Sequence, residues 1–197
     1  MPMPPDDLAN APDEALITRF ANGDAVAAQA LTERLTPVVM AHAYRLLADR
    51  AEAEDVAQDA MMRLWRVARD WRHGEAKVTT WLYRVTANLA TDRLRKRRRA
   101  GPPLDDLPEP ADKTPGVVAK LVEKDRAEAL QAALAGLPER QRQAVILRHL
   151  EGLANPEIAE IMEISTEAVE SLTARGKRAL AAALSGKREE LGYGYDG

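Results

Sequence analysis

The sequence predicts an all-α fold of two small helical modules joined by a flexible, acidic, proline-rich linker. Hydrophobic residues make up 46% of the chain but aromatic residues only 4%, a composition that favours helices with small cores over a sandwich or barrel. Apolar residues recur at helical spacing through most of the chain. The exception is the segment 101–116, where five prolines and four acidic residues leave little from which to build a core.

The first module is predicted to span residues 13–100, after a proline-rich, acidic N-terminus, residues 1–12, that we expect to be disordered. Gly23 is typical of a residue that ends a helix, Pro37 predicts a bend, and the sequence HGEAKV predicts a loop before the last helix. The four predicted helices cover about 13–22, 24–50, 51–71 and 79–99.

The fourth predicted helix carries one polar face. Arg84, Asn88, Thr91 and Arg95 recur at i, i+4, i+7 and i+11, so they share an outer face of the helix. Two guanidinium groups that flank an amide and a hydroxyl suit a nucleic-acid strand, with the cations on phosphates and the amide on a base edge. The alternative is an ordinary solvated face, with Trp71 and Trp81 as core residues and the basic helix end favoured by the helix dipole.

The second module is predicted to span residues 117–185, followed by a flexible tail, residues 186–197. Gly136 and Gly152 are expected to end its first two helices, and Pro138 to begin the second. The sequence NPEIAEIMEISTEAVESLTARGKRAL then predicts a short helix, a three-residue turn and a longer helix, which is the helix-turn-helix arrangement of DNA readers. In it we expect Asn155 to cap the short helix and Ser165 or Thr166 to cap the long one.

The outer face of that long helix is the candidate duplex-binding surface. Val169 and Gly176 belong to its inner stripe, so the opposite face is free to enter a major groove. Basic residues there can hold phosphates, and a glutamate can accept a hydrogen bond from cytosine N4. The alternative is an exposed helix with ordinary surface charge. The candidate residues are Glu167, Glu170, Ser171, Ala174, Arg175, Lys177 and Arg178.

Charge is strongly segregated along the chain. The formal net charge is only −3, yet residues 81–100 hold seven basic residues and one acidic residue, whereas residues 151–170 hold six glutamates and no basic residue. Such blocks predict charged partners.

The composition also excludes several kinds of site. The chain has no cysteine, which excludes disulfides, a thiol nucleophile and cysteine-ligated zinc. No apolar run approaches the roughly 20 residues of a membrane span, and the acidic N-terminus is unlike a signal peptide. We therefore expect a soluble cytoplasmic protein with no membrane insertion, metal or cofactor.

Two long motifs carry a resemblance to a known family. The stretch AEDVAQDAMMRLWRVARDW, followed by GEAKVTTWLYRVTANLATDRLRKRRR, resembles region 2 of the extracytoplasmic-function (ECF) sigma factors of the sigma-70 class. LAGLPERQRQAVILRHLEGLANPEIAEIMEISTEAVESLTARGKRAL resembles their region 4. The similarity covers about residues 13–185. It implies a protein that binds RNA polymerase core, recognises promoter DNA and helps to melt it.

The resemblance also implies a role for each surface. The third helix would dock on the clamp helices of the largest polymerase subunit through Asp55, Gln58, Asp59, Met62 and Trp65. The loop and fourth helix would hold the non-template strand of the −10 element, with Asn88 and Asp92 at positions where relatives capture a flipped base. The implied −10 residues are His73, Lys77, Thr80, Trp81, Arg84, Asn88, Thr91, Asp92 and Arg95. The phosphate anchors are Arg93, Lys96, Arg97, Arg98 and Arg99. The helix-turn-helix would read the −35 element, the acidic linker would run through the polymerase cleft, and an anti-sigma factor is a further implied partner.

Three positions depart from the family pattern. Many relatives have an arginine after the recognition-helix valine, where this chain has Glu170, so the −35 sequence it reads is expected to differ. Glu163 stands in the turn where a glycine is frequent, at a modest conformational cost. Lys77 and Val78 stand where the loop often has Ser-Phe.

Other functions are weaker interpretations of the same residues. A helix-turn-helix regulator that is not a polymerase subunit would need an effector or dimerisation domain, and a sigma-like decoy would have a degraded basic face. An enzyme is the remotest alternative, because His42, His73 and His149 are far apart in sequence and no carboxylate pair or phosphate-binding glycine loop is present. No small-molecule substrate is expected.

Overall fold

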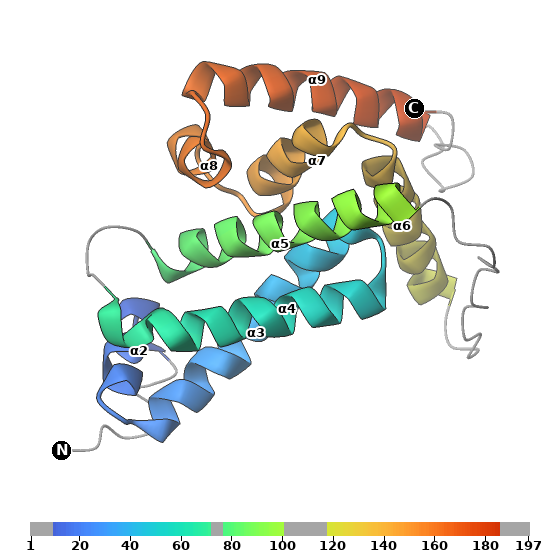
Figure 1. The fold of residues 1–197 in the computed structure, drawn as a ribbon. Coiled ribbons are helices and arrows are strands. Elements are labelled where there is room, and N and C mark those ends of the chain that lie inside the picture. Colours follow the sequence, from blue (N-terminus) through green and yellow to red (C-terminus); the bar gives the residue numbers. More distant parts are fainter. Residues whose placement is uncertain (1–9, 72–76, 101–117, 186–197) are drawn as a thin grey trace.

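The computed structural model describes residues 10–71, 77–100 and 118–185, and within these ranges it contains helices and no strand (Figure 1). The all-α prediction is confirmed. The predicted linker, the C-terminal tail and residues 1–9 of the predicted disordered N-terminus lie outside the described residues. The prediction of disorder is wrong at Ala11, which is 7% exposed and packs in the core of the first module. The first module contains α2 (Asp13–Ala21), α3 (Ala25–Leu47), α4 (Arg50–Val67), the 3-10 turn η1 (Ala68–Asp70) and α5 (Val78–Ala100). The second contains α6 (Val118–Ala135), α7 (Glu139–Val145), the π-helical turn η2 (Ile146–Leu150), α8 (Asn155–Met162) and α9 (Thr166–Ser185).

Aspartates cap the N-termini of α3 and α4. The Asp24 carboxylate accepts hydrogen bonds from the backbone N–H groups of Val26 and Ala27 at 3.0 and 3.2 Å, and the Asp49 carboxylate accepts one from Glu52 at 2.9 Å. These bonds satisfy backbone donors that the first helical turn leaves without a partner. α3 continues through Pro37, so the proline does not divide it.

α5 is the central element of the fold. It crosses the molecule between α3 and α4 on one side and α7, α8 and α9 on the other (Figure 1). One buried cluster joins α2, α3, α4 and the first turns of α5 around Leu31, Leu64 and Leu82. A second cluster crosses between the modules, bringing Leu47 and Ala90 together with Ile146. The two modules therefore share a hydrophobic core.

The helix-turn-helix follows the predicted pattern, with one correction. The turn begins at Glu163 in the left-handed conformation (φ 54°), and the Ser165 hydroxyl accepts from the Ala168 N–H at 3.2 Å as the cap of α9. The cap of α8, however, is Ala154 and not Asn155, which is the first helical residue. Glu157 takes over the capping role, because its carboxylate accepts from the Ala154 N–H at 3.0 Å.

Gly176 sets the distance between α7 and α9. A Cβ atom at this position would lie 2.6 Å from Val145 Cγ2 and 3.1 Å from the carbonyl oxygen of Gln141. A side chain here would force the Val145 side chain or the α7 backbone to shift, so glycine allows α9 to pack closely on α7. This contact fixes the orientation of the outer face of α9.

Candidate nucleic-acid interface

α5 presents the polar face that its sequence predicts. Arg84, Asn88, Asp92 and Arg95 are exposed and Thr91 is half-buried, whereas the opposite side of the helix packs into the core. The guanidinium, amide and hydroxyl groups therefore lie along one surface. The spacing of these residues is sufficient to define that surface without knowledge of any tertiary contact.

The N-terminal end of α5 mixes exposed and packed side chains. Lys77 is exposed, but Thr80 is 5% exposed and belongs to the interior. Trp71 and Trp81 pack edge to face, with ring centroids 5.9 Å apart, against the core of the first module. Their half-buried state fits the interpretation of both tryptophans as core residues. His73 lies outside the described residues.

The second module lies against the polar face of α5. Asn88, Thr91 and Arg95 line a polar cleft of about 290 Å³. Its other wall comes from α7 and α8, and includes Gln143 and Met162. In this conformation the candidate strand-binding side chains face protein groups of the same chain.

Ion pairs connect the two modules along the length of α5. Lys77 Nζ lies 2.9 Å from a carboxylate oxygen of Glu157. The capping hydrogen bond from the Ala154 N–H and the hydrogen bond from Lys77 lower the pKa of Glu157. Arg84 forms an ion pair with Glu163. In the last turn, Arg98 lies 3.1 Å from Glu139.

A buried carboxylate lies at the centre of the contact between the modules. The side chain of Glu151 is only 7% exposed. Its Oε1 accepts hydrogen bonds from Arg45 at 2.7 Å and from His42 Nδ1 at 3.1 Å, and its Oε2 accepts from the Tyr83 hydroxyl at 3.0 Å. Because an ionised carboxylate only accepts, His42 Nδ1 carries the hydrogen. One residue of the second module thus binds three side chains of the first.

Burial and hydrogen bonding act in opposite directions on Glu151. Burial raises the pKa of the carboxyl group, but the hydrogen bond and charge of His42, the charge of Arg45 and the hydrogen bond from Tyr83 outweigh it. The pKa of Glu151 therefore lies below its ordinary value. Burial and the neighbouring carboxylate raise the pKa of Tyr83, so its hydroxyl stays protonated and donates.

The π-helical turn explains how Glu151 reaches this position. The Glu151 N–H donates to the carbonyl oxygen of Ile146, five residues earlier, at 3.0 Å, which is the hydrogen bond of a π-helix. Gly152 follows in the left-handed conformation (φ 72°) and ends the helix. The glycine was predicted as the helix end, and that prediction is confirmed.

The C-terminus of α3 forms a second contact between the modules. The last carbonyl groups of a helix have no intrahelical partner. Here Gln131 Nε2 donates to the carbonyl oxygens of Tyr44 and Arg45 at 3.0 and 3.3 Å, and Arg142 donates to that of Leu46 at 2.6 Å. The second module therefore satisfies backbone groups of the first.

The basic run at the end of α5 is not uniformly free. Arg93 lies 3.2 Å from Asp55 and 4.0 Å from Asp59, and Arg97 donates to the carbonyl oxygen of Leu47 at 3.4 Å. Among the described residues, Lys96 and Arg99 are exposed and form no ion pair or hydrogen bond. The structure thus gives part of this run a role in packing α5 against α3 and α4.

The outer face of α9 is open along its length. The side chain of Asn155 reaches Glu170 at 3.4 Å, and Arg175 donates to the carbonyl oxygen of Ser171 at 3.2 Å. On its inner side the helix buries Val169 and Gly176, and Leu172 and Leu180 pack against core clusters. All seven candidate residues are exposed: Glu167, Glu170, Ser171, Ala174, Arg175, Lys177 and Arg178.

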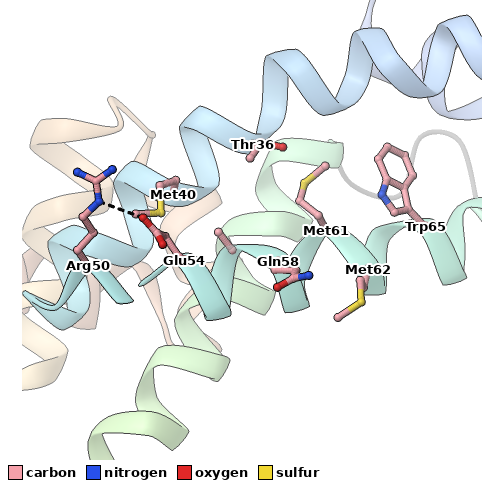
Figure 2. A pocket seen from close by; sticks show the side chains of 9 residues that line it. Thr36, Met40, Arg50, Glu54, Gln58, Met61, Met62 and Trp65 are labelled. Carbon is pink, nitrogen blue, oxygen red and sulfur yellow. Dashed lines mark hydrogen bonds and ion pairs between the residues drawn. The ribbon is translucent and has the colours of Figure 1, made fainter. Parts of the chain in front are cut away.

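α3 and α4 enclose an apolar groove of about 430 Å³ (Figure 2). Gln58, Met62 and Trp65, three of the five candidate polymerase contacts, line it together with Met40 and Met61 (Figure 2). The other two, the aspartates that Arg93 contacts, lie at the α5 edge of the same helix face. All of the described residues that line the groove belong to the first module.

Comparisons with known proteins identify the family. The model of Sigma-70 region 2 matches residues 31–100, and that of Sigma-70, region 4 matches residues 127–180. The RNA polymerase sigma-H factor of Pseudomonas aeruginosa is 31% identical over 186 residues, which cover 90% of this chain and 96% of that protein. The ECF RNA polymerase sigma-E factor of Haemophilus influenzae is 32% identical over 174 residues, which cover 84% and 91%. The chain belongs to the ECF sigma factors of the sigma-70 family.

A solved sigma factor has the same fold. The sigma factor RpoE of Bartonella quintana, in complex with the anti-sigma factor NepR, superposes with a TM-score of 0.63 over 78% of this sigma factor and 94% of that chain, at 22% identity. The likeness at this identity concerns the fold alone. In this sigma factor, the region 2 match covers most of α3 and the whole of α4 and α5, and the region 4 match covers the second half of α6, the whole of α7 and α8, and most of α9. None of the described helices is both long and apolar enough to cross a membrane.

Sequence reasoning missed the residues that join the two regions of this sigma factor. Glu151 belongs to the acidic block noted in the sequence, but nothing local distinguishes it from the other five glutamates. His42 occupies an apolar stripe of α3 between Val39 and Leu46, a position that signals burial without naming a partner. The pairing across 109 residues depends on how the regions dock.

Proposed function

We propose that this ECF sigma factor binds the RNA polymerase core, recognises a promoter through two separate DNA-binding surfaces and helps to melt it. The observation that carries the proposal is the pair of polar helix faces, on α5 of region 2 and α9 of region 4. Each presents cations beside hydrogen-bonding groups, which is what phosphate anchoring combined with base readout requires. The relatives are named as RNA polymerase sigma factors.

The two faces suit different forms of DNA. α9 follows a helix-turn-helix turn, and its exposed face, with Glu170 and Arg178, suits the major groove of a duplex −35 element. α5 carries Asn88 between Arg84 and Arg95 and suits the unpaired non-template strand of a −10 element, as does the neighbouring Asp92. Lys96 and Arg99, which have no partner in the described part of the chain, suit phosphates next to it.

The apolar groove between α3 and α4 suits polymerase docking. Met62 is 40% exposed, and exposed methionine beside Trp65 and Gln58 is typical of a helix-binding surface. We propose the clamp helices of the largest subunit as the occupant. An anti-sigma factor is proposed as the controlling partner, because the Bartonella quintana factor of the same fold was solved with one.

Runoff transcription tests the function as a whole. The purified chain is combined with core RNA polymerase and with promoter fragments from the source genome. We expect transcripts that require the added chain and that vanish when core polymerase is omitted. If no promoter fragment of that genome yields a chain-dependent transcript, the proposed function is wrong.

Asn88→Ala should reduce open-complex formation by about tenfold, because the loss of a hydrogen bond to a base edge costs about 1–3 kcal/mol. Binding of core polymerase should be unchanged, since Asn88 lies away from the α3–α4 groove. Permanganate footprinting measures melting, and fluorescence anisotropy measures core binding. Gln29→Ala, which removes an exposed amide on α3, is the matched control. Equal losses of melting and core binding would show that Asn88 is structural.

A further inference from the structure

Region 4 places three glutamates against the DNA-binding side of region 2. Glu139 of α7, Glu157 of α8 and Glu163, which directly follows α8, are here called the acidic face. Their partners are cations on or directly before α5: Arg98, Lys77 and Arg84 in the same order. The acidic block that the sequence shows between 151 and 170 thus meets the basic helix α5. Neither proposed DNA-binding role explains this match.

We propose that the acidic face occupies the single-strand-binding face of α5 as a substitute for DNA, so that the closed chain and DNA compete for the same cations. The proposal rests on the function proposed for α5. Carboxylates and phosphates are recognised by the same guanidinium geometry. A guanidinium that holds a carboxylate on one edge is not free to hold a phosphate there.

The contacts follow the helix along its whole length. Lys77 precedes α5, Arg84 lies in its second turn and Arg98 in its last. At about 1.5 Å per residue, these cations are distributed over about 30 Å of the helix. A single strand that tracks α5 would meet the same row of charges. Between the ion pairs, Asn88, Thr91 and Arg95 lie in the cleft that α7 and α8 close.

Buried and exposed contacts contribute differently to this closed state. Glu151 with its three donors is buried, and the shared core lies around it. In the three outer ion pairs the cations are exposed: the side chains of Lys77, Arg98 and Arg84 are 70%, 67% and 44% exposed. Exposed pairs of this kind contribute little individually and are screened by salt. The outer pairs therefore adjust the balance between closed and open chains without being needed for folding.

The other two proposed binding surfaces stay accessible in the closed state. The outer face of α9 is exposed from Glu167 to Arg178, and the α3–α4 groove is open. Of the three proposed binding surfaces, the acidic face covers only the polar face of α5. A closed chain can therefore dock on polymerase through α4 before α5 becomes available to a melted strand.

The test removes the outer carboxylates and leaves Glu151 in place. The variant E139Q/E157Q/E163Q loses three negative charges opposite α5. Glutamine at 157 keeps a side-chain acceptor for the Ala154 N–H. None of the three residues belongs to the proposed DNA or polymerase contacts. E33Q/E128Q/E160Q is the control, because it changes the net charge equally at exposed positions, and none of these glutamates forms an ion pair with α5.

Two measurements are made on full-length chains. The first is energy transfer between dyes on the introduced cysteines Arg66→Cys and Ala182→Cys, both at exposed positions of a chain that has no cysteine of its own. The second is anisotropy of a short fluorescein-labelled single-stranded oligodeoxynucleotide at low ionic strength, with undyed protein. We expect lower energy transfer and about tenfold tighter oligonucleotide binding for E139Q/E157Q/E163Q, because apparent affinity rises with the open fraction. The control should match the parent chain in both.

A fourth substitution tests whether the gain in oligonucleotide affinity depends on α5. Adding Arg84→Gln to the triple variant should abolish most of the gain in oligonucleotide affinity while energy transfer stays low. The inference is overturned if the triple variant and the control give the same energy transfer, or if the chain opens without tighter oligonucleotide binding. These failures differ from failure of the proposed function, because neither measurement uses polymerase and the function is judged by runoff transcripts.

Discussion

Glu151→Ala should lower the free energy of unfolding by about 3 kcal/mol at pH 7, because it leaves His42, Arg45 and Tyr83 without their common acceptor. The cost comes mainly from His42 and Tyr83, which are 0% and 7% exposed and lose the acceptor for their donors. Urea unfolding followed by circular dichroism measures the loss. Energy transfer between the two regions shows whether they separate before the helices melt.

The effect of Glu151→Ala should depend on pH. Since the pKa of Glu151 is lower in the folded chain than its ordinary value of 4.5, the carboxylate stabilises the folded state fully above that value. This contribution is lost as the pH falls through the folded pKa. The difference between parent and variant should therefore be largest near neutral pH and shrink below pH 4.5.

Glu160→Ala is the matched control, since Glu160 is an exposed glutamate of the same acidic block. It should change stability by less than about 0.5 kcal/mol. A Glu151→Ala chain as stable as the Glu160→Ala chain at pH 7 would show that the three donors find water or other partners. In that case the central contact between the regions would be the apolar core alone.

The helices and the helix-turn-helix could be predicted because their signals are local. The spacing of Arg84, Asn88, Thr91 and Arg95 defines one face wherever the helix lies, and Ser165 caps α9 through a neighbouring backbone group. The error at Asn155 has the same origin. Ala154 has no side-chain acceptor, so the local pattern favours the nearest polar residue, Asn155, as the cap. In the structure Glu157, three residues after Ala154, supplies the acceptor.

The docking of the two regions could not be predicted, because it depends on pairings between distant segments. The basic run of α5 indicates a polyanion equally well whether that polyanion is DNA or an acidic face of the same chain. Arg93 and Arg97 show the same ambiguity, since both contact region 2 itself. The pattern of charged residues predicts the sign of the charge on a partner. Only the fold shows which partner lies against the basic run of α5.

Arg142→Met should lower the free energy of unfolding by about 3 kcal/mol, because it leaves three backbone carbonyl groups without donors. Arg142 is 8% exposed, and burial lowers the pKa of its guanidinium, although arginine stays charged in proteins. It donates to Leu46 at 2.6 Å in region 2 and to Ala135 and Leu137 at 2.9 and 3.2 Å in region 4. The methionine keeps most of the apolar stem and none of the donors.

Arg142→Lys separates charge from geometry. The ammonium group of lysine keeps the charge, but it cannot donate at the same time to the end of α3 and to the turn between α6 and α7, as the planar guanidinium does. We therefore expect the free energy of unfolding to fall by an intermediate amount, about 1–2 kcal/mol. Arg63→Met, at an exposed position of α4, controls for the loss of one surface arginine and should be nearly neutral. Urea unfolding compares the three chains. Equal stability of the lysine and methionine chains would mean that the forked hydrogen bonds, and not the charge, account for the contribution of Arg142. A methionine chain as stable as the Arg63→Met chain would contradict the prediction.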